Sequence, residues 1–157
     1  MQVFTPPQIP TPKKNYFEGK HIFLAGTIDM GGSADWQAEA IKLLEEKYKE
    51  WTENVVVLNP RKSDWNPEWG TQFENPEAFQ QMTWELDQMK AADVIIMNIL
   101  PDSKSPITLL ELGLFASSGK LRVICPKKFY RSGNVHMICY RYNIPLYDTL
   151  EECIKAL

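Results

Sequence analysis

Short, continuous apolar runs recur along the chain and predict buried β-strands. A run of apolar residues without polar alternation is typical of a strand that is covered on both faces, as in a parallel sheet. The expected strands are residues 21–26, 55–58, 94–99 and 121–125, with residues 144–147 as a short last strand or edge segment. The pattern therefore predicts a sheet of roughly five strands.

The segments between the strands carry apolar residues at helical spacing. Pro76 and Pro106 each follow an N-cap residue, Asn75 and Ser105, which is typical of the first turn of a helix. The expected helices begin at residue 33 or 35 and end near 51, then span 75–92, 105–118 and 134–142, and Thr149 caps a closing helix. Strict alternation of strand and helix predicts an α/β fold with a parallel sheet between two layers of helices.

The first 18 residues differ in composition from the rest of the chain. They contain four prolines and no uninterrupted apolar stretch, so they lack the pattern of a signal peptide. Residues 1–18 are expected to form an extended, proline-rich arm that packs on a neighbour or stays mobile. No repeat or linker follows, and residues 19–157 are predicted to form one domain.

Composition narrows the classes of function. The 157 residues are 44% hydrophobic and 24% charged, which is the balance of one globular domain with a core. A net charge of −3 lacks the basic excess that nucleic acid polymers require, and no apolar run approaches the roughly 20 residues of a membrane helix.

Three cysteines without CxxC spacing indicate neither a disulfide framework nor a metal site, and they favour a reducing, cytoplasmic location. A Cys125 nucleophile is disfavoured, because no oriented third group accompanies His136.

Polar loops follow the predicted strands at residues 26–36, 59–69, 98–111 and 126–134. Ligands of parallel α/β sheets bind at the carboxyl ends of the strands. Any single polar loop is explained equally well as ordinary protein surface. Because the topology brings four of them to one edge of the sheet, we expect the functional site at that edge.

Glu111 is the most conspicuous carboxylate of these loops and their helices. It lies among the apolar residues of 108–113, where a charge is unfavourable unless it faces a cleft. The alternative is a capping box formed by Thr108 and Glu111. Pro106 argues against this alternative, because it places Thr108 inside the helix and leaves Glu111 free near the positive end of the helix.

Glu85, on the preceding helix, is the second candidate carboxylate. Met82, Leu86 and Met89 recur at helical spacing and are expected to form the buried stripe of this helix. Glu85 directly precedes Leu86, so it lies at the border of that buried stripe and faces either the cleft or solvent. Asp87 lies on the other side, which makes Glu85 the better candidate.

The same loops supply candidate ligand-binding residues, which are Gly26, Thr27, Asp29, Asn59, Arg61, Trp65, Asn98 and Ser105. The glycine-containing loop after the first strand suits a phosphate or a sugar, although it is neither a G-x-G-x-x-G sequence nor a P-loop. Asn59 is explained equally well as a turn residue before proline, and Arg61, with Lys62, as a solvated charge. Trp65 and Trp69 either stack on a flat base or cover the core.

Four short motifs carry a family resemblance. Residues 106–113, PITLLELG, are the most specific, and residues 23–26, 59–61 and 84–95 contain the others. Together they resemble the nucleoside 2-deoxyribosyltransferase superfamily, in particular its short bacterial and phage branch, over nearly the whole chain after the arm. With the strand and helix pattern, the resemblance implies an α/β, flavodoxin-like three-layer fold with a roughly five-stranded parallel sheet. It also implies a homo-oligomer in which a neighbouring subunit completes each pocket.

The resemblance implies roles for individual residues. Glu111 matches the glutamate that attacks the anomeric carbon of a nucleoside. Glu85 matches a carboxylate that assists at the base and is aspartate in better-known members. Where known transferases carry an aspartate shortly before the nucleophile, this chain has Ser105, with Asp102 nearby.

The implied reaction is N-glycosyl transfer or hydrolysis on a (2'-deoxy)nucleoside or nucleotide through a covalent glycosyl-enzyme intermediate. Two carboxylates suffice for this chemistry, so no metal or cofactor is expected. The expected partner is a small molecule rather than a nucleic acid polymer or a membrane, and the acceptor is either a second base or water.

A tyrosine that orients the nucleophile in known transferases corresponds here to Phe23 or Ile22. This departure and Ser105 suit an alternative, a nucleotide-binding or sensing module with little or no catalysis.

Overall fold

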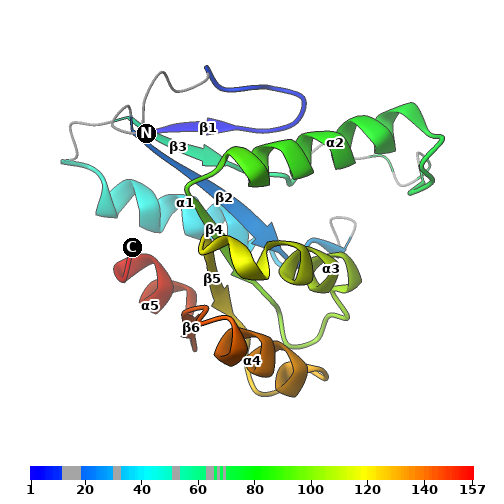
Figure 1. The fold of residues 1–157 in the computed structure, drawn as a ribbon. Coiled ribbons are helices and arrows are strands. Elements are labelled where there is room, and N and C mark those ends of the chain that lie inside the picture. The colour runs from blue at the N-terminus through cyan, green and yellow to red at the C-terminus, as the bar shows by residue number, and fades with distance from the viewer. Residues whose placement is uncertain (12–18, 30–32, 51–53, 63–65, 67, 69) are drawn as a thin grey trace.

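A computed structural model describes residues 1–11, 19–29, 33–50, 54–62, 66, 68 and 70–157. In this part of the chain a single sheet has six strands, all parallel, in the order β1-β3-β2-β4-β5-β6 (Figure 1). The strands are β1 (Gln2–Phe4), β2 (Lys20–Gly26), β3 (Val55–Leu58), β4 (Val94–Asn98), β5 (Leu121–Ile124) and β6 (Leu146–Tyr147). The strands from β2 onward have the predicted flavodoxin-like order, in which the topological switch point lies between β2 and β4.

The sixth strand comes from the N-terminal arm. β1 pairs in parallel with β3, and the Asn59 N–H donates to the Phe4 carbonyl at 2.9 Å. Farther along the arm, the Trp84 indole N–H donates to the Gln8 carbonyl at 2.7 Å. In the described part of the arm, β1 is a strand of the chain's own sheet and a turn follows it at residues 6–7, while residues 12–18 lie outside the described residues.

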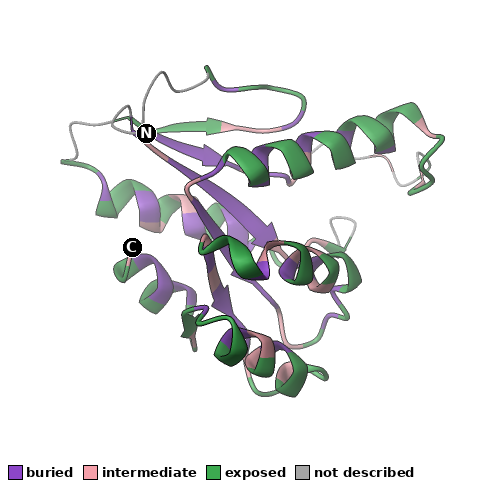
Figure 2. Ribbon diagram, in the orientation of Figure 1, coloured by how far each residue is buried: buried purple, intermediate pink, exposed green. Residues whose placement is uncertain are grey.

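Helices cover both faces of the sheet (Figure 1). α1 (Trp36–Lys47) and α5 (Leu150–Lys155) cover one face, and α2 (Pro76–Ala91), α3 (Pro106–Phe115), the 3-10 turn η3 (Ala116–Ser118) and α4 (Ser132–Arg141) cover the other. Because successive side chains of a strand point to opposite faces, Leu24 packs with α1 and α5 whereas Phe23 packs with α2 and α3. The central strands are buried between the two helical layers, as the purple ribbon of Figure 2 shows. No helix in the described ranges is long and apolar enough to cross a bilayer.

The helix starts follow the predicted capping residues. Asn75 Oδ1 accepts from the Ala78 N–H at 3.0 Å, and Thr149 caps α5 in the same way. α1 is capped by Asp35 and ends at Lys47, a few residues earlier than the apolar spacing predicts. These local signals position the helices against the sheet.

β2 and β4 approach each other closely at Gly26. Its φ is +136°, and a Cβ at this position would lie 2.1 Å from the Asn98 carbonyl oxygen. Glycine is the residue that fits both this backbone conformation and this space. The Thr27 N–H bonds to the same carbonyl at 3.0 Å, so the loop after β2 leaves the sheet beside the end of β4.

The buried face of α2 differs from the prediction. Met82 and Leu86, expected in the buried stripe, are exposed. The buried residues of this helix are Ala78, Gln81, Trp84, Gln88 and Met89. Trp84 packs against Phe23 with ring centroids 6.0 Å apart, and this large ring fixes the rotation of the helix about its axis. The rotation carries Glu85, the next residue, toward the interior.

Candidate active site

α2 and α3 bring two carboxylates together. Glu111 lies in the second turn of α3, close enough to Glu85 of α2 for the charge of Glu85 to raise its pKa. α3 begins at Pro106, and Thr108 is buried inside the helix, which excludes the alternative of a Thr108 capping box. The two predicted carboxylates therefore form one site.

Burial controls the protonation of this pair. Loss of hydration raises the pKa of Glu111 to about 8, and the charge of Glu85 is the second cause. Burial also raises the pKa of Glu85, and a hydrogen bond from Gln81 opposes that rise. Two carboxyl groups this close titrate as a coupled pair, in which a single proton can be held by either group. Such a pair offers one ionised and one protonated group at the same place.

Gln81 belongs to the site although the sequence pattern did not single it out. Its Nε2 donates to the Pro60 carbonyl at 2.9 Å and to Glu85 Oε1 at 2.8 Å. The signal in the sequence is a pair of glutamines, Gln81 and Gln88, seven residues apart on one face of a helix that packs on a sheet. Gln81 links the loop after β3 to the carboxylate pair.

Ser105 is part of a chain of hydrogen-bonded hydroxyls between the loops after β2 and β4. Its Oγ lies 2.6 Å from Thr27 Oγ1 and 2.9 Å from Ser103 Oγ, and the Ser103 hydroxyl donates to Asp29 Oδ1 at 2.8 Å. Because the proton of Ser103 goes to Asp29, Ser105 donates to Ser103 and Thr27 donates to Ser105. Ser105 occupies the N-cap position of α3, yet its side chain makes no capping bond. Asp29 is exposed, and its Oδ2 makes no hydrogen bond within the described ranges.

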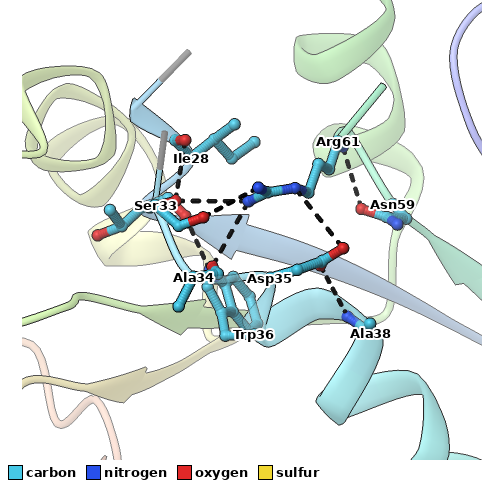
Figure 3. Close-up of polar contacts among 9 residues, drawn as sticks. Ile28, Ser33, Ala34, Asp35, Trp36, Ala38, Asn59 and Arg61 are labelled. Atoms are coloured by element: carbon cyan, nitrogen blue, oxygen red, sulfur yellow. Dashed lines mark hydrogen bonds and ion pairs between the residues drawn. The ribbon is translucent and has the colours of Figure 1, made fainter. Parts of the chain in front are cut away.

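Arg61 clamps the loop that precedes α1 (Figure 3). Its guanidinium donates to the carbonyls of Ser33 at 3.0 Å and Ala34 at 3.5 Å, and it lies 3.7 Å from the Asp35 carboxylate. Asn59 Oδ1 accepts from the backbone N–H of Arg61 at 3.0 Å, which is the turn geometry that was the alternative explanation for Asn59. These bonds shape the edge of the site, and ligand contacts of the two residues stay predictions.

The other predicted ligand-binding residues lie at the switch point or outside the described part of the chain. Asn98 ends β4 beside Gly26 and is buried, and its side-chain amide has no hydrogen-bond partner among the described residues. Trp65, together with Asp64 and Trp69, lies outside the described residues. Asn98 therefore offers an unused donor and acceptor between β2 and β4.

Phe23 is the strand residue that faces α2 and α3. It packs with Trp84 and Leu112, whereas Ile22 belongs to the core on the α1 side. The resemblance places an orienting tyrosine at one of these two positions, and a phenyl ring there has no hydroxyl to donate. The lack of such a donor fits the raised pKa of Glu111, since a hydrogen bond to the carboxylate would lower it.

The cysteines do not supply an alternative nucleophile. Cys125, Cys139 and Cys153 are free and buried, and burial raises the pKa of Cys125 to about 11. A thiol with this pKa is protonated at neutral pH and reacts poorly. Over the ranges that the structure describes, no group of three or more His, Cys, Asp or Glu side chains is placed to hold a metal ion.

Comparisons with known proteins agree with this architecture. Residues 19–129 match a family model described as nucleoside 2-deoxyribosyltransferase like. The chain is also similar to a solved structure, a conserved protein from Enterococcus faecalis V583, with a TM-score of 0.58 and 9% sequence identity over 87% of this chain and 95% of that chain. At this identity the similarity concerns the fold alone. Comparison with curated proteins gave no match.

Proposed function

Because the chain belongs to the nucleoside 2-deoxyribosyltransferase-like family, we propose that it cleaves the N-glycosidic bond of a (2'-deoxy)nucleoside or nucleotide. The observation that carries this proposal is the half-buried pair of Glu85 and Glu111, in which the charge of one raises the pKa of the other. The residues matched by the family model include both carboxylates. A pair with one shared proton provides a nucleophile and an acid without any further group.

Glu111 is the nucleophile in this reaction. Its carboxylate oxygen forms a bond to the anomeric carbon while the bond from that carbon to the base nitrogen breaks, and the electron pair of the broken bond goes to the base. Glu85 gives its proton to the departing base. A second base or water then attacks the same carbon, releases Glu111, and returns a proton to Glu85.

The polar groups around the switch point favour a nucleoside over its 5'-monophosphate. Three groups that could bind a phosphate, on Thr27, Ser33 and Arg61, are engaged inside the protein. The Ser33 hydroxyl donates to the Ile28 carbonyl at 2.9 Å, the Thr27 hydroxyl donates to Ser105, and the Arg61 guanidinium holds the loop carbonyls. By contrast, Asn98 and Asp29 offer groups suited to sugar hydroxyls.

A chromatographic screen of nucleosides, deoxynucleosides and their monophosphates, each with and without an added free base, tests the proposal. We expect free base to be released, and faster from a nucleoside than from its monophosphate. A new nucleoside in the presence of the second base identifies a transferase, and release without it identifies a hydrolase. Calorimetric binding without any release over hours would instead support the sensing module. Ser105 favours that alternative, because its hydroxyl is used within the protein where known transferases carry an aspartate.

The shared proton predicts a bell-shaped dependence of kcat/KM on pH. Glu111 reacts when ionised and Glu85 when protonated, so the rate should rise as the first proton leaves the pair and fall as the second leaves, near pH 8. Initial rates of base release from about pH 5 to about pH 10 measure both limbs. In Glu85→Gln the alkaline limb should be absent, because Glu111 then titrates alone. A wild-type rate that continues to rise well above pH 8 would contradict the assignment of Glu85 as the acid.

Two exposed apolar stripes support the homo-oligomer that the resemblance implies. One stripe lies on α3 and the other on α2, the helices that carry the carboxylate pair. Their members are Ile107, Leu110 and Leu114 on α3, which are 61%, 68% and 60% exposed, and Phe79, Met82 and Leu86 on α2. Apolar patches of this kind mark protein–protein contacts. We propose that subunits associate through these stripes, beside the site.

We expect wild-type protein to be larger than its 18.1 kDa monomer mass in light scattering at micromolar concentration. Leu110→Glu should dissociate it, because the charge would be buried unpaired at the contact. Leu146→Glu is the control, since Leu146 is also exposed but lies on β6, away from both stripes. A wild-type monomer, or equal dissociation by both substitutions, would exclude this contact.

A further inference from the structure

Gln81 holds the Glu85 carboxyl group in one orientation. The two N–H groups of its Nε2 donate to the Pro60 carbonyl oxygen at 2.9 Å and to Glu85 Oε1 at 2.8 Å. The Pro60 carbonyl has no proton to give, so the Gln81 amide cannot turn its own oxygen toward it without losing that bond. The nitrogen of Gln81 is therefore fixed toward Glu85.

The fixed amide decides which oxygen of Glu85 can hold a proton. Glu85 Oε1 accepts an N–H from Gln81, so an O–H on this oxygen would point at a donor. A proton on Glu85 consequently resides on Oε2. The titratable group that another helix places near Glu85 is Glu111, and the loop after β3 contributes the Pro60 carbonyl.

Gln81 also leaves one of its own atoms without a partner. Its Oε1 is buried and makes no hydrogen bond. A buried, unpaired carbonyl destabilises a protein, and a helix position facing a sheet is usually apolar. Such a group calls for an explanation, and the bond from Gln81 to Glu85 supplies one.

We propose that Gln81 is a positioning residue that keeps the transferable proton of Glu85 on Oε2. The use of this proton, delivery to the nitrogen of the leaving base, rests on the proposed function. The orientation itself rests on the bonds of Gln81 to Pro60 and Glu85. Without Gln81, either oxygen holds the proton, and the Glu85 anion loses a hydrogen bond.

A carbon-13 NMR titration tests the orientation without reference to activity. Protein labelled at the glutamate carboxyl carbon gives the Glu85 resonance, identified by its loss in Glu85→Gln. In Gln81→Met the midpoint of this resonance should rise by about one pH unit, because the Gln81 bond lowers the pKa of Glu85 in the wild type. Gln88→Met is the matched control, since Gln88 is buried on the same helix and its side-chain amide has no hydrogen-bond partner in the described ranges. Gln81→Leu is the second variant if Gln81→Met does not fold.

Rates of base release complete the experiment. Gln81→Met should lower kcat by about tenfold or more with little change in KM, because the acid is misplaced while the pocket is kept. A nitrophenyl deoxyriboside, whose leaving group needs no proton, should be cleaved by this variant at the wild-type rate. An unchanged Glu85 midpoint in Gln81→Met, or an equal shift in Gln88→Met, overturns the inference. If the midpoint shifts but the wild type releases no base from any nucleoside, the proposed function fails and the positioning role of Gln81 stands.

Discussion

Exchanging Glu111 for glutamine should remove activity and make the protein more stable. Glutamine forms no glycosyl ester, so base release should fall by at least about a thousandfold. The gain in stability follows from the pKa of Glu111, which burial and the charge of Glu85 raise to about 8. An acid whose pKa is raised in the folded state destabilises the fold progressively as the pH rises from its ordinary pKa to the raised one. Glutamine carries no charge in either state, so the variant avoids this destabilisation. At pH 7 its free energy of unfolding should therefore exceed that of the wild type by up to about 3 kcal/mol.

Thermal unfolding and chromatographic rates measured on the same samples check both halves of this expectation. At pH 7 the Glu111→Gln variant should unfold at a higher temperature than the wild type, and the difference should shrink as the pH falls to about 4 or below, where Glu111 becomes protonated in the unfolded state as well. Glu151→Gln, an exposed position in the first turn of α5, should leave the rate unchanged and should lower the stability slightly, because it removes a favourable charge at the start of the helix. A variant with wild-type turnover would exclude Glu111 as the nucleophile. A variant less stable than the wild type at pH 7 would contradict the raised pKa.

The second large effect is expected for Gly26→Ala, and it concerns stability. An alanine Cβ would lie 2.1 Å from the Asn98 carbonyl oxygen, and the residue would have to keep a φ of +136°. Relief requires β2 and β4, which pair from Ile22 to Gly26, to move apart at their carboxyl ends. We expect the free energy of unfolding to fall by about 3–5 kcal/mol, or the variant not to fold.

Urea unfolding of Gly26→Ala beside Gly133→Ala measures this effect with a matched control. A Cβ at Gly133, on α4, would meet nothing within 4 Å. Alanine there should be neutral or stabilise the protein by up to about 1 kcal/mol, as expected for a helix position. Equal stability of the two variants would mean that β2 and β4 do not approach each other as closely as described.

The elements that could be predicted from the sequence are those decided by neighbouring residues. β4 is a continuous apolar run, and the start of α2 depends on Asn75 and Pro76 alone. The buried face of α2 could not be predicted in this way. The spacing of Met82 and Leu86 shows that they share a face, but the contact of Trp84 with Phe23, far away in sequence, decides which face is buried.

The residues of the candidate site also fall into those that local sequence marks and those that depend on contacts distant in sequence. Glu111 could be singled out because its surroundings in the sequence are apolar on both sides, and Glu85 because it lies beside a helical stripe. Gln81 could not, since its role depends on the Pro60 carbonyl, which the sheet brings to it from 21 residues earlier. The bond between Thr27 and Ser105 joins residues 78 positions apart, and no local pattern marks it.

The N-terminal strand has a consequence for how the protein behaves among its own copies. Unpaired N–H and C=O groups along a sheet edge are a template on which another chain can add a strand, and the outer edge of β3 would be such a template without β1. β1 is only three residues long, and Pro6 and Pro7 follow it closely, so it closes the edge of β3 and offers a poor edge itself. A chain shortened by its first 11 residues would leave Val55–Leu58, four apolar residues in a row, open to the same strand of a second molecule. By pairing with β3, the N-terminal residues cover an edge at which two copies of the protein would otherwise associate. This effect on aggregation is independent of the chemistry at the carboxylate pair.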